Sequence, residues 1–272
     1  MRPWAGPVVR AGLCAALSGG LLLPQAEVPQ EVLLLTRIRR KMAENLGRIP
    51  DYTCVETIER STRANRAPRF QLRDTVRLEV AHVGGKELYS APGAQKFEER
   101  EISELVGGGM TASGDFASHA RSVFSNSVPS FTYKGEEEIE GRRTVRYDYY
   151  LPINFSGYRL RYGRQAAIVA SPGSFWADPQ SLEVVRLEVR AEQIPPSIAV
   201  LSAVTRIDYD RVRIGASEVL LPQRAELLMS DFWGGQSLNR TLFTDCRQYV
   251  SESVVMFVES EVTYGPPAKK KK

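Results

Sequence analysis

Apolar and polar residues alternate most regularly between Phe175 and Glu192, in the sequence FWADPQSLEVVRLEVRAE. One phase of this stretch holds the apolar residues Val185, Leu187, Val189 and Ala191, and arginine and glutamate fill the other phase. A period of two residues is typical of a β-strand with one buried and one solvated face. We therefore predict a half-buried strand, which follows Trp176 and a turn at Asp178-Pro179.

The same period recurs along most of the chain. From Phe131 onward the chain is predicted to be almost all strand, with a turn at Gly141 after Ile139. The further predicted strands are 52–60, 70–80, 87–90, 144–151, 166–170, 199–209, 218–229, 237–249 and 254–259. Tyr147 and Tyr149 share one phase of the strand that ends at Leu151. The short spacing between these runs suits one hairpin after another, so we predict a large antiparallel sheet without parallel crossovers.

Two segments break the strand pattern. From Pro29 to Gly47, apolar residues recur every three or four positions, which predicts a helix that packs on the sheet, with a membrane-surface helix as the alternative. Residues 93–127 combine a helical stretch, Phe97 to Val106, with a glycine-rich stretch, and predict a short helical insertion. These glycines lack the spacing of a phosphate-binding loop, so we favour a lid or rim over the sheet.

The N-terminus is typical of a secretory signal peptide. Arg2 and Arg10 precede the apolar run Ala11 to Leu23. This run is shorter than the roughly 20 residues of a membrane-spanning helix. We predict a signal peptide over 1–26 and export to the bacterial periplasm, with lipid attachment at Cys14 as a weaker alternative. The cysteines left after cleavage are Cys54 and Cys246, and an even count in an exported chain favours a disulfide over two separate buried thiols.

The positive charge of the chain lies at its two ends. The formal net charge is +4, but two positive charges belong to the leader and four to Lys269–Lys272. The body is therefore slightly acidic, which argues against a nucleic-acid partner. Residues 263–272 are predicted to be a disordered basic tail, which either makes peripheral contact with anionic membranes or only aids solubility.

Catalytic and metal-binding signatures are absent from the sequence. His82 and His119 are the only histidines, and neither has a partner at helical metal-site spacing. The chain has no G-x-S-x-G motif, and the acidic run at Glu136 to Glu138 is best explained as a solvated turn. We expect no catalytic residue, no metal and no cofactor, and treat an enzyme as the least favoured class.

A short pattern around the strand between Phe175 and Glu192 resembles the LolA-type fold. Proteins with this fold include periplasmic lipoprotein carriers, their outer-membrane receptor and related sensor domains. The residues that carry this resemblance are Trp176, Asp178, Pro179, Arg186, Leu187 and Glu188, followed by Ile207-Asp208-Tyr209 and Leu221-Pro222. The sequence also resembles uncharacterised exported proteins of soil bacteria. The resemblance implies an α+β fold over one domain, 27–262, in which the antiparallel sheet curves into a half-barrel with the helices on its concave side.

The resemblance also implies an apolar concave face that binds a lipid, an acyl chain or a lipoprotein without catalysis. The candidate lining residues are Trp176, Val185, Leu187, Val189, Tyr147 and Tyr149, for which core packing is the alternative explanation. The second hypothesis is an envelope protein-interaction or sensor module with a filled core and no ligand. A concave face filled by large side chains favours the second hypothesis, and an open one favours the first.

Overall fold

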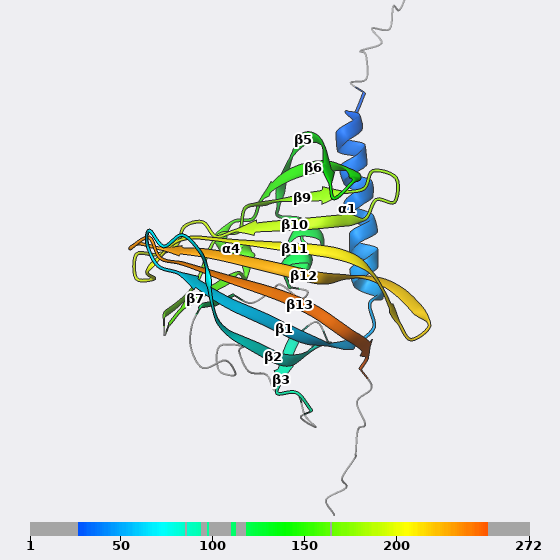
Figure 1. Cartoon of the computed structure of the whole chain (residues 1–272). Helices are drawn as coiled ribbons and strands as arrows, with labels where there is room; N and C mark the ends of the chain where they lie inside the picture. Colours follow the sequence, from blue (N-terminus) through cyan, green and yellow to red (C-terminus); the bar gives the residue numbers. More distant parts are fainter. Residues whose placement is uncertain are drawn as a thin grey trace, which may run out of the picture.

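The computed structural model describes residues 27–84, 86–93, 97, 110–112, 118–163 and 165–249. The predicted leader, the strand 254–259, the basic tail and most of the insertion 93–127 lie outside the described residues. In the described part, ten antiparallel strands form one sheet in the order β3-β2-β1-β13-β12-β11-β10-β9-β6-β5 (Figure 1). The strands are β1 (Tyr52–Arg63), β2 (Gln71–Val83), β3 (Lys86–Ser90), β5 (Ser130–Ile139), β6 (Arg142–Tyr150), β9 (Gly173–Ala177), β10 (Val184–Arg190), β11 (Val200–Ile214), β12 (Ser217–Asp231) and β13 (Gln236–Gln248).

Most neighbours in the sheet are also neighbours in sequence, which confirms the predicted antiparallel meander. One exception is β1, which pairs with β13 near the other end of the described chain, and another is β6, which pairs with β9. The sheet ends at β3 and β5, which do not pair with each other in the described structure, so it curves without closing. The predicted α+β half-barrel is therefore confirmed.

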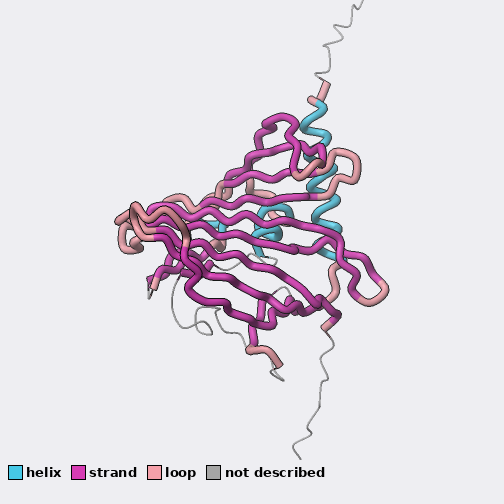
Figure 2. The backbone as a smooth tube through the Cα atoms, in the orientation of Figure 1, coloured by secondary structure: helices cyan, strands magenta, loops and turns pink. Residues whose placement is uncertain are grey.

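A three-stranded sheet and three described helices complete the fold. The small sheet has the order β4 (Met110–Ala112), β7 (Arg159–Tyr162), β8 (Gln165–Ile168). The described helices are α1 (Gln30–Arg48), α3 (Ser118–Phe124) and α4 (Ile153–Ser156). Figure 2 shows α1 and α3 on the same side of the large sheet.

Helix α1 follows Pro29, whose carbonyl accepts a hydrogen bond from Val32 N over 3.0 Å. The predicted apolar stripe buries Ile38, Met42 and Leu46, which are 0–5% exposed, whereas Val32 near the first turn is 45% exposed. The stripe is therefore buried along the C-terminal half of the helix and exposed near its start. Since the residue before a proline avoids helical geometry, Pro50 helps to end the helix.

The core lies between these helices and the concave face of β6, β9, β10 and β11. Phe175 stacks on Tyr147 at a centroid distance of 5.3 Å and meets Phe124 of α3 edge-on at 5.1 Å. Leu187 and Ile207 pair across β10 and β11, and both are 0% exposed. Large side chains thus fill this part of the concave face.

Candidate functional site

Four of the predicted lining residues lie on the concave face, where they are packed rather than open. Leu187, Val189, Tyr147 and Tyr149 are 0–4% exposed. The Tyr147 hydroxyl donates to the Glu31 carbonyl of α1 over 2.7 Å, and burial raises the pKa of Tyr147 to about 12. The Tyr149 hydroxyl donates to the Glu188 carbonyl over 3.2 Å. These residues therefore form core beneath α1 and between strands.

Trp176 lies on the opposite, convex face of the sheet. It pairs across the sheet with Arg146 of β6 and Arg186 of β10, while Phe175 occupies the concave face. Its Nε1 donates to Glu137 Oε2 over 2.7 Å, and the Arg146 guanidinium carbon lies 5.2 Å from its ring centroid. This position differs from the concave lining expected for Trp176, because Phe175 is the aromatic residue that takes the inner phase.

Val185 also differs from its expected position, because the register of β10 shifts between Val184 and Arg186. The bulge puts Val184 opposite Ala177, where it is 1% exposed. Val185 is half-buried and borders a surface hollow with Arg186 and Asp208. The extra residue of a bulge breaks the two-residue period, so Val185 leaves the face of Leu187 and Val189.

Cys54 and Cys246 form the expected disulfide, with Cα atoms 4.1 Å apart. The bond joins β1 to β13 at the point where their register shifts. It therefore links two neighbouring strands that are 192 residues apart in sequence.

The two histidines are buried against tyrosines. His82 lies 5.8 Å from the Tyr52 ring, and burial lowers its pKa. His119 meets Tyr158 edge-on at 4.8 Å, and burial lowers its pKa to about 4. Both imidazoles are therefore neutral near pH 7. In the part of the chain that the structure describes, no three His, Cys, Asp or Glu side chains gather as metal ligands, and no helix is long and apolar enough to cross a membrane.

The convex face carries a lattice of mutually neutralising charges around a hollow of about 500 Å³. Arg186 pairs with Asp208 and Glu140. The other ion pairs of this lattice are Arg206 with Glu188 and Arg240 with Glu226. Because each of these arginines already faces a carboxylate, the lattice offers little net charge to an ionic ligand.

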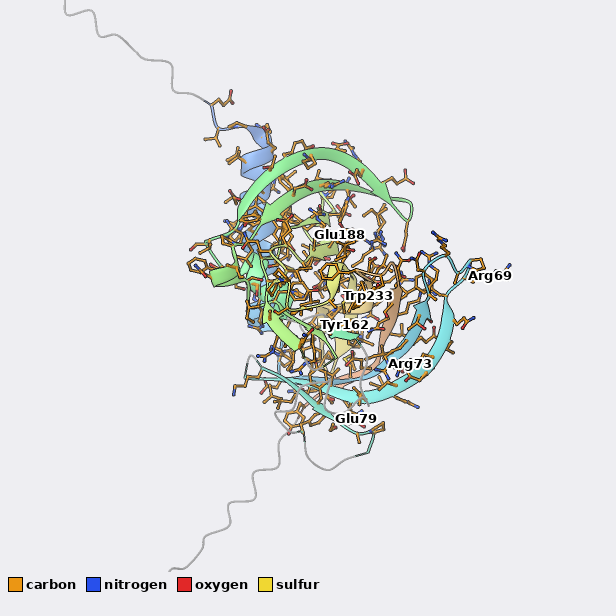
Figure 3. The ribbon with its side chains drawn as sticks, turned by 90° about the vertical axis from the view of Figure 1, so that its left-hand side faces the viewer. Arg69, Arg73, Glu79, Tyr162, Glu188 and Trp233 are labelled. Carbon is orange, nitrogen blue, oxygen red and sulfur yellow. A yellow bond between two sulfur atoms is a disulfide. The ribbon has the colours of Figure 1, made fainter. Side chains whose placement is uncertain are left out.

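A different hollow, of about 550 Å³, opens at one end of the half-barrel. We call this end the open end; it contains the β1–β2 loop (64–70), the β12–β13 hairpin (232–235) and Tyr162-Gly163 at the end of β7. The hollow is lined by Thr62, Arg63, Ala64, Arg73, Tyr162, Gly163, Asp231, Gly235, Gln236 and Ser237. Figure 3 looks toward this end and shows Tyr162 near its middle, with Arg73 on the β2 side.

Several contacts hold the walls of this hollow. Arg63 donates to Gln236 Oε1 and lies 4.8 Å from the Phe70 ring centroid. Asp231 accepts hydrogen bonds from Trp233 N and Gly235 N at 2.9 and 2.8 Å, which fixes the β12–β13 turn. No carboxylate of the described chain forms an ion pair with Arg63 or Arg73. The open end is thus a preformed hollow whose arginines have no carboxylate partner among the described residues, unlike the convex lattice.

The sequence interpretation missed the open end as a site, because it left 61–69 only as the connection between the predicted strands 52–60 and 70–80. A signal was nevertheless present: Arg63, Arg66, Arg69 and Arg73 occur between Ser61 and Arg73 without an acidic residue. Tyr162 and the 231–237 segment give no comparable signal, because only the fold brings them beside this loop.

No family model and no curated protein matches the sequence. Similar solved structures include a DUF1329 family protein from Desulfovibrio piger, with 12% identity, a TM-score of 0.39, and coverage of 80% of this chain and 94% of that chain. A LolA superfamily protein from Nitrosomonas europaea has 12% identity, a TM-score of 0.38 and coverage of 79% and 94%. A putative outer membrane lipoprotein-sorting protein domain from Vibrio parahaemolyticus has 12% identity, a TM-score of 0.43 and coverage of 79% and 93%. Proteins of the group that the sequence resembles are therefore among the structural neighbours of this chain, while its ligand and activity have to be argued from its own residues.

Proposed function

We propose that this chain is a non-enzymatic protein of the bacterial envelope that binds a lipid or lipoprotein at the open end of the half-barrel. The observation that carries the proposal is the preformed hollow of about 550 Å³ lined by Arg63, Arg73 and Tyr162. Its size falls within the roughly 300–1,000 Å³ of common ligand sites. The envelope location rests on the predicted signal peptide.

The chemistry of the hollow suits the polar end of an amphiphile better than a bare acyl chain. Guanidinium groups without carboxylate partners favour phosphate or carboxylate oxygens, which they bind by charge-assisted hydrogen bonds. Thr62, Gln236 and Ser237 add polar groups around Arg63 and Arg73. The concave face under α1 is filled, so the proposed ligand position moves from the predicted Leu187 and Val189 lining to the open end.

Native mass spectrometry of protein purified from the periplasm tests this proposal. We expect a lipid-sized adduct, or uptake of phosphatidylglycerol or a diacylated lipopeptide by the apo protein. Ser237→Phe, which adds bulk to the hollow, and Arg73→Gln, which removes a charge from it, should reduce uptake at least tenfold. The matched control is Leu242→Phe, which adds bulk on the exposed convex side of the same strand. A wild-type protein that stays free of both ligands would refute the proposal.

The filled concave face favours a second candidate, an envelope interaction module without a ligand. Ile38 and Met42 of α1 are 0% and 1% exposed against the sheet, and Phe124 of α3 is 3% exposed. Under this candidate, crosslinking in intact cells would capture one defined envelope protein, and the purified chain would take up neither phosphatidylglycerol nor the lipopeptide.

A further inference from the structure

The three most exposed large apolar side chains of the described residues lie at the open end, beside Phe232. Trp233, Leu201 and Leu72 are 66%, 65% and 63% exposed, and Phe232 is 54% exposed. Trp233 and Phe232 form the tip of the β12–β13 hairpin, Leu201 begins β11 and Leu72 begins β2. Strand pairing places these positions together, because Val200 pairs with Asp231, and Thr62 pairs with both Ser237 and Gln71.

The same end carries an excess of positive charge. Arg63 ends β1, Arg73 lies near the start of β2, and Arg66 and Arg69 lie exposed in the loop between them. Figure 3 shows Arg69 projecting away from the body of the half-barrel. The Asp74 carboxylate is already paired with Arg60, which donates two hydrogen bonds to it at 2.7 and 2.6 Å. The Asp231 carboxylate accepts hydrogen bonds within its own turn. With Glu192 as a further carboxylate after β10, the four arginines outnumber the acidic groups at this end.

The apolar tip and the basic loop are fastened to each other. Asn65 Nδ2 donates to the Trp233 carbonyl over 2.9 Å, and the Asn65 side chain packs against Gly234. Figure 1 shows the β1–β2 connection and the β12–β13 hairpin side by side, at the opposite end from the β11–β12 hairpin. A partner would therefore meet the aromatic and the basic residues as one surface.

We infer that this surface, formed by Arg66, Arg69, Leu72, Leu201, Phe232 and Trp233, docks the protein on an anionic lipid bilayer. A bilayer interface supplies both components that the surface matches: phosphate groups for the arginines, and an apolar layer for tryptophan, phenylalanine and leucine side chains. Nucleic acid offers phosphates but no apolar layer for Leu72 and Leu201. An acidic protein offers charge, but exposed Trp and Phe beside arginine are better matched by headgroups and acyl chains together.

This inference is independent of the proposed ligand, because Arg66, Arg69 and the aromatic tip do not line the hollow. The hollow nevertheless opens at the same end, so docking would bring it to the membrane surface. The Lys269–Lys272 tail is a separate cationic segment of the same chain, and the experiment has to distinguish it from the docking surface.

Vesicle flotation of the full chain tests the inference, with vesicles of phosphatidylcholine alone or of equal parts phosphatidylcholine and phosphatidylglycerol. We expect binding only to the anionic vesicles, and weaker binding as salt screens the arginines. Arg66→Gln with Arg69→Gln should weaken partitioning roughly 20- to 30-fold, at about fivefold per charge. Phe232→Ser with Trp233→Ser should also weaken it at least tenfold. The control Arg142→Gln with Arg143→Gln, which removes the same charge from the exposed start of β6, should leave partitioning unchanged.

The outcomes separate the possible explanations. Loss of binding in both open-end variants, with retention in Arg142→Gln/Arg143→Gln, supports the docking surface. Ser237→Phe should bind vesicles normally even if it loses the ligand, so the two proposals can fail separately. Binding that survives both open-end variants would assign membrane contact to another segment, such as the lysine tail, and overturn the inference. If an acidic polypeptide displaced the protein from anionic vesicles as effectively as free anionic vesicles do, the surface would be a general anion-binding site. That result would also overturn the inference.

Discussion

The indole of Trp176 donates its only N–H to Glu137 Oε2 over 2.7 Å, on the convex face of the sheet. This hydrogen bond links β9 to β5, strands that do not pair directly because β6 lies between them. Arg146 of β6 covers the indole and also pairs with Glu137 at 3.1 Å. Trp176 therefore belongs to a cross-strand cluster with Glu137 and Arg146, in which each side chain contacts the other two.

Loss of the indole donor should change the titration of Glu137. The hydrogen bond from Trp176 is the main cause of the lowered pKa of Glu137, and Arg146 contributes as well. Since a lowered folded-state pKa adds stability that is lost as the pH falls through it, this contribution disappears under acidic conditions. Trp176→Phe should raise the pKa of Glu137 toward its ordinary value of 4.5, as measured by carboxyl NMR titration. Trp233→Phe is the matched control, and an unchanged pKa in Trp176→Phe would disprove the assigned cause.

The two-residue period was sufficient to predict most strands of the large sheet, but it missed β4 and β7 of the small sheet and did not give the face of every side chain. Phe175 and Trp176 are both large and aromatic, so alternation alone gives no sign that Phe175 points inward and Trp176 outward. The bulge at Val185 is equally hidden, because Val184 and Val185 are the same residue type. Such choices are made by pairing across strands, as when Leu187 meets Phe175.

The open end was the least predictable part, because it joins segments that are distant in sequence. The hydrogen bond between Arg63 and Gln236 spans 173 residues. The helix α1 and the disulfide were predictable for the opposite reason: an apolar stripe and an even cysteine count can be recognised without knowledge of the fold. Local pattern thus predicted the scaffold, and long-range strand order determined the candidate site.

Gly173 is required where β9 passes beneath Tyr149. A Cβ at this position would lie 1.9 Å from the Glu188 carbonyl oxygen and 2.5 Å from the Tyr149 hydroxyl oxygen. Because backbone has to shift to relieve such contacts, Gly173→Ala should lower the free energy of unfolding by about 3 kcal/mol or more. Gly47→Ala is the control: nothing lies within 4 Å of the added Cβ, and alanine should stabilise α1 by about 0.5–1 kcal/mol. Urea unfolding measures both, and equal effects would contradict the crowding at Gly173.

The packing of α1 over the concave face should be an integral part of the folded core. Met42 is 1% exposed, so Met42→Ala should cost about 2–5 kcal/mol of unfolding free energy. Leu33 of the same helix is 46% exposed, and Leu33→Ala should cost about 0.5 kcal/mol or less. Chemical denaturation checks the difference. Similar small costs at both positions would mean that α1 adheres weakly and that the concave face opens readily.

The disulfide should stabilise the chain although β1 and β13 are already paired. Replacing Cys54 and Cys246 together with alanine removes a link across 192 residues, and should lower the unfolding free energy by about 2–5 kcal/mol. Wild-type protein unfolded in the presence of a reductant should match the double variant. If reduction has no effect on wild-type stability, strand pairing alone fixes the two segments.

His119 should make the protein sensitive to mild acid. Its side chain is buried against Tyr158, and its pKa is lowered to about 4 because burial disfavours the charged imidazolium. The unfolded state has the ordinary pKa of 6.5 and binds more protons between these values, so stability falls as the pH decreases through this window. The loss between pH 7 and pH 5 should be about 2 kcal/mol from this residue. His119→Phe retains an aromatic ring against Tyr158 and should flatten that slope in urea unfolding measured at each pH. His82, whose pKa burial also lowers, should leave a smaller residual slope that His82→Phe removes. A slope that persists unchanged in His119→Phe would show that other groups account for the acid sensitivity.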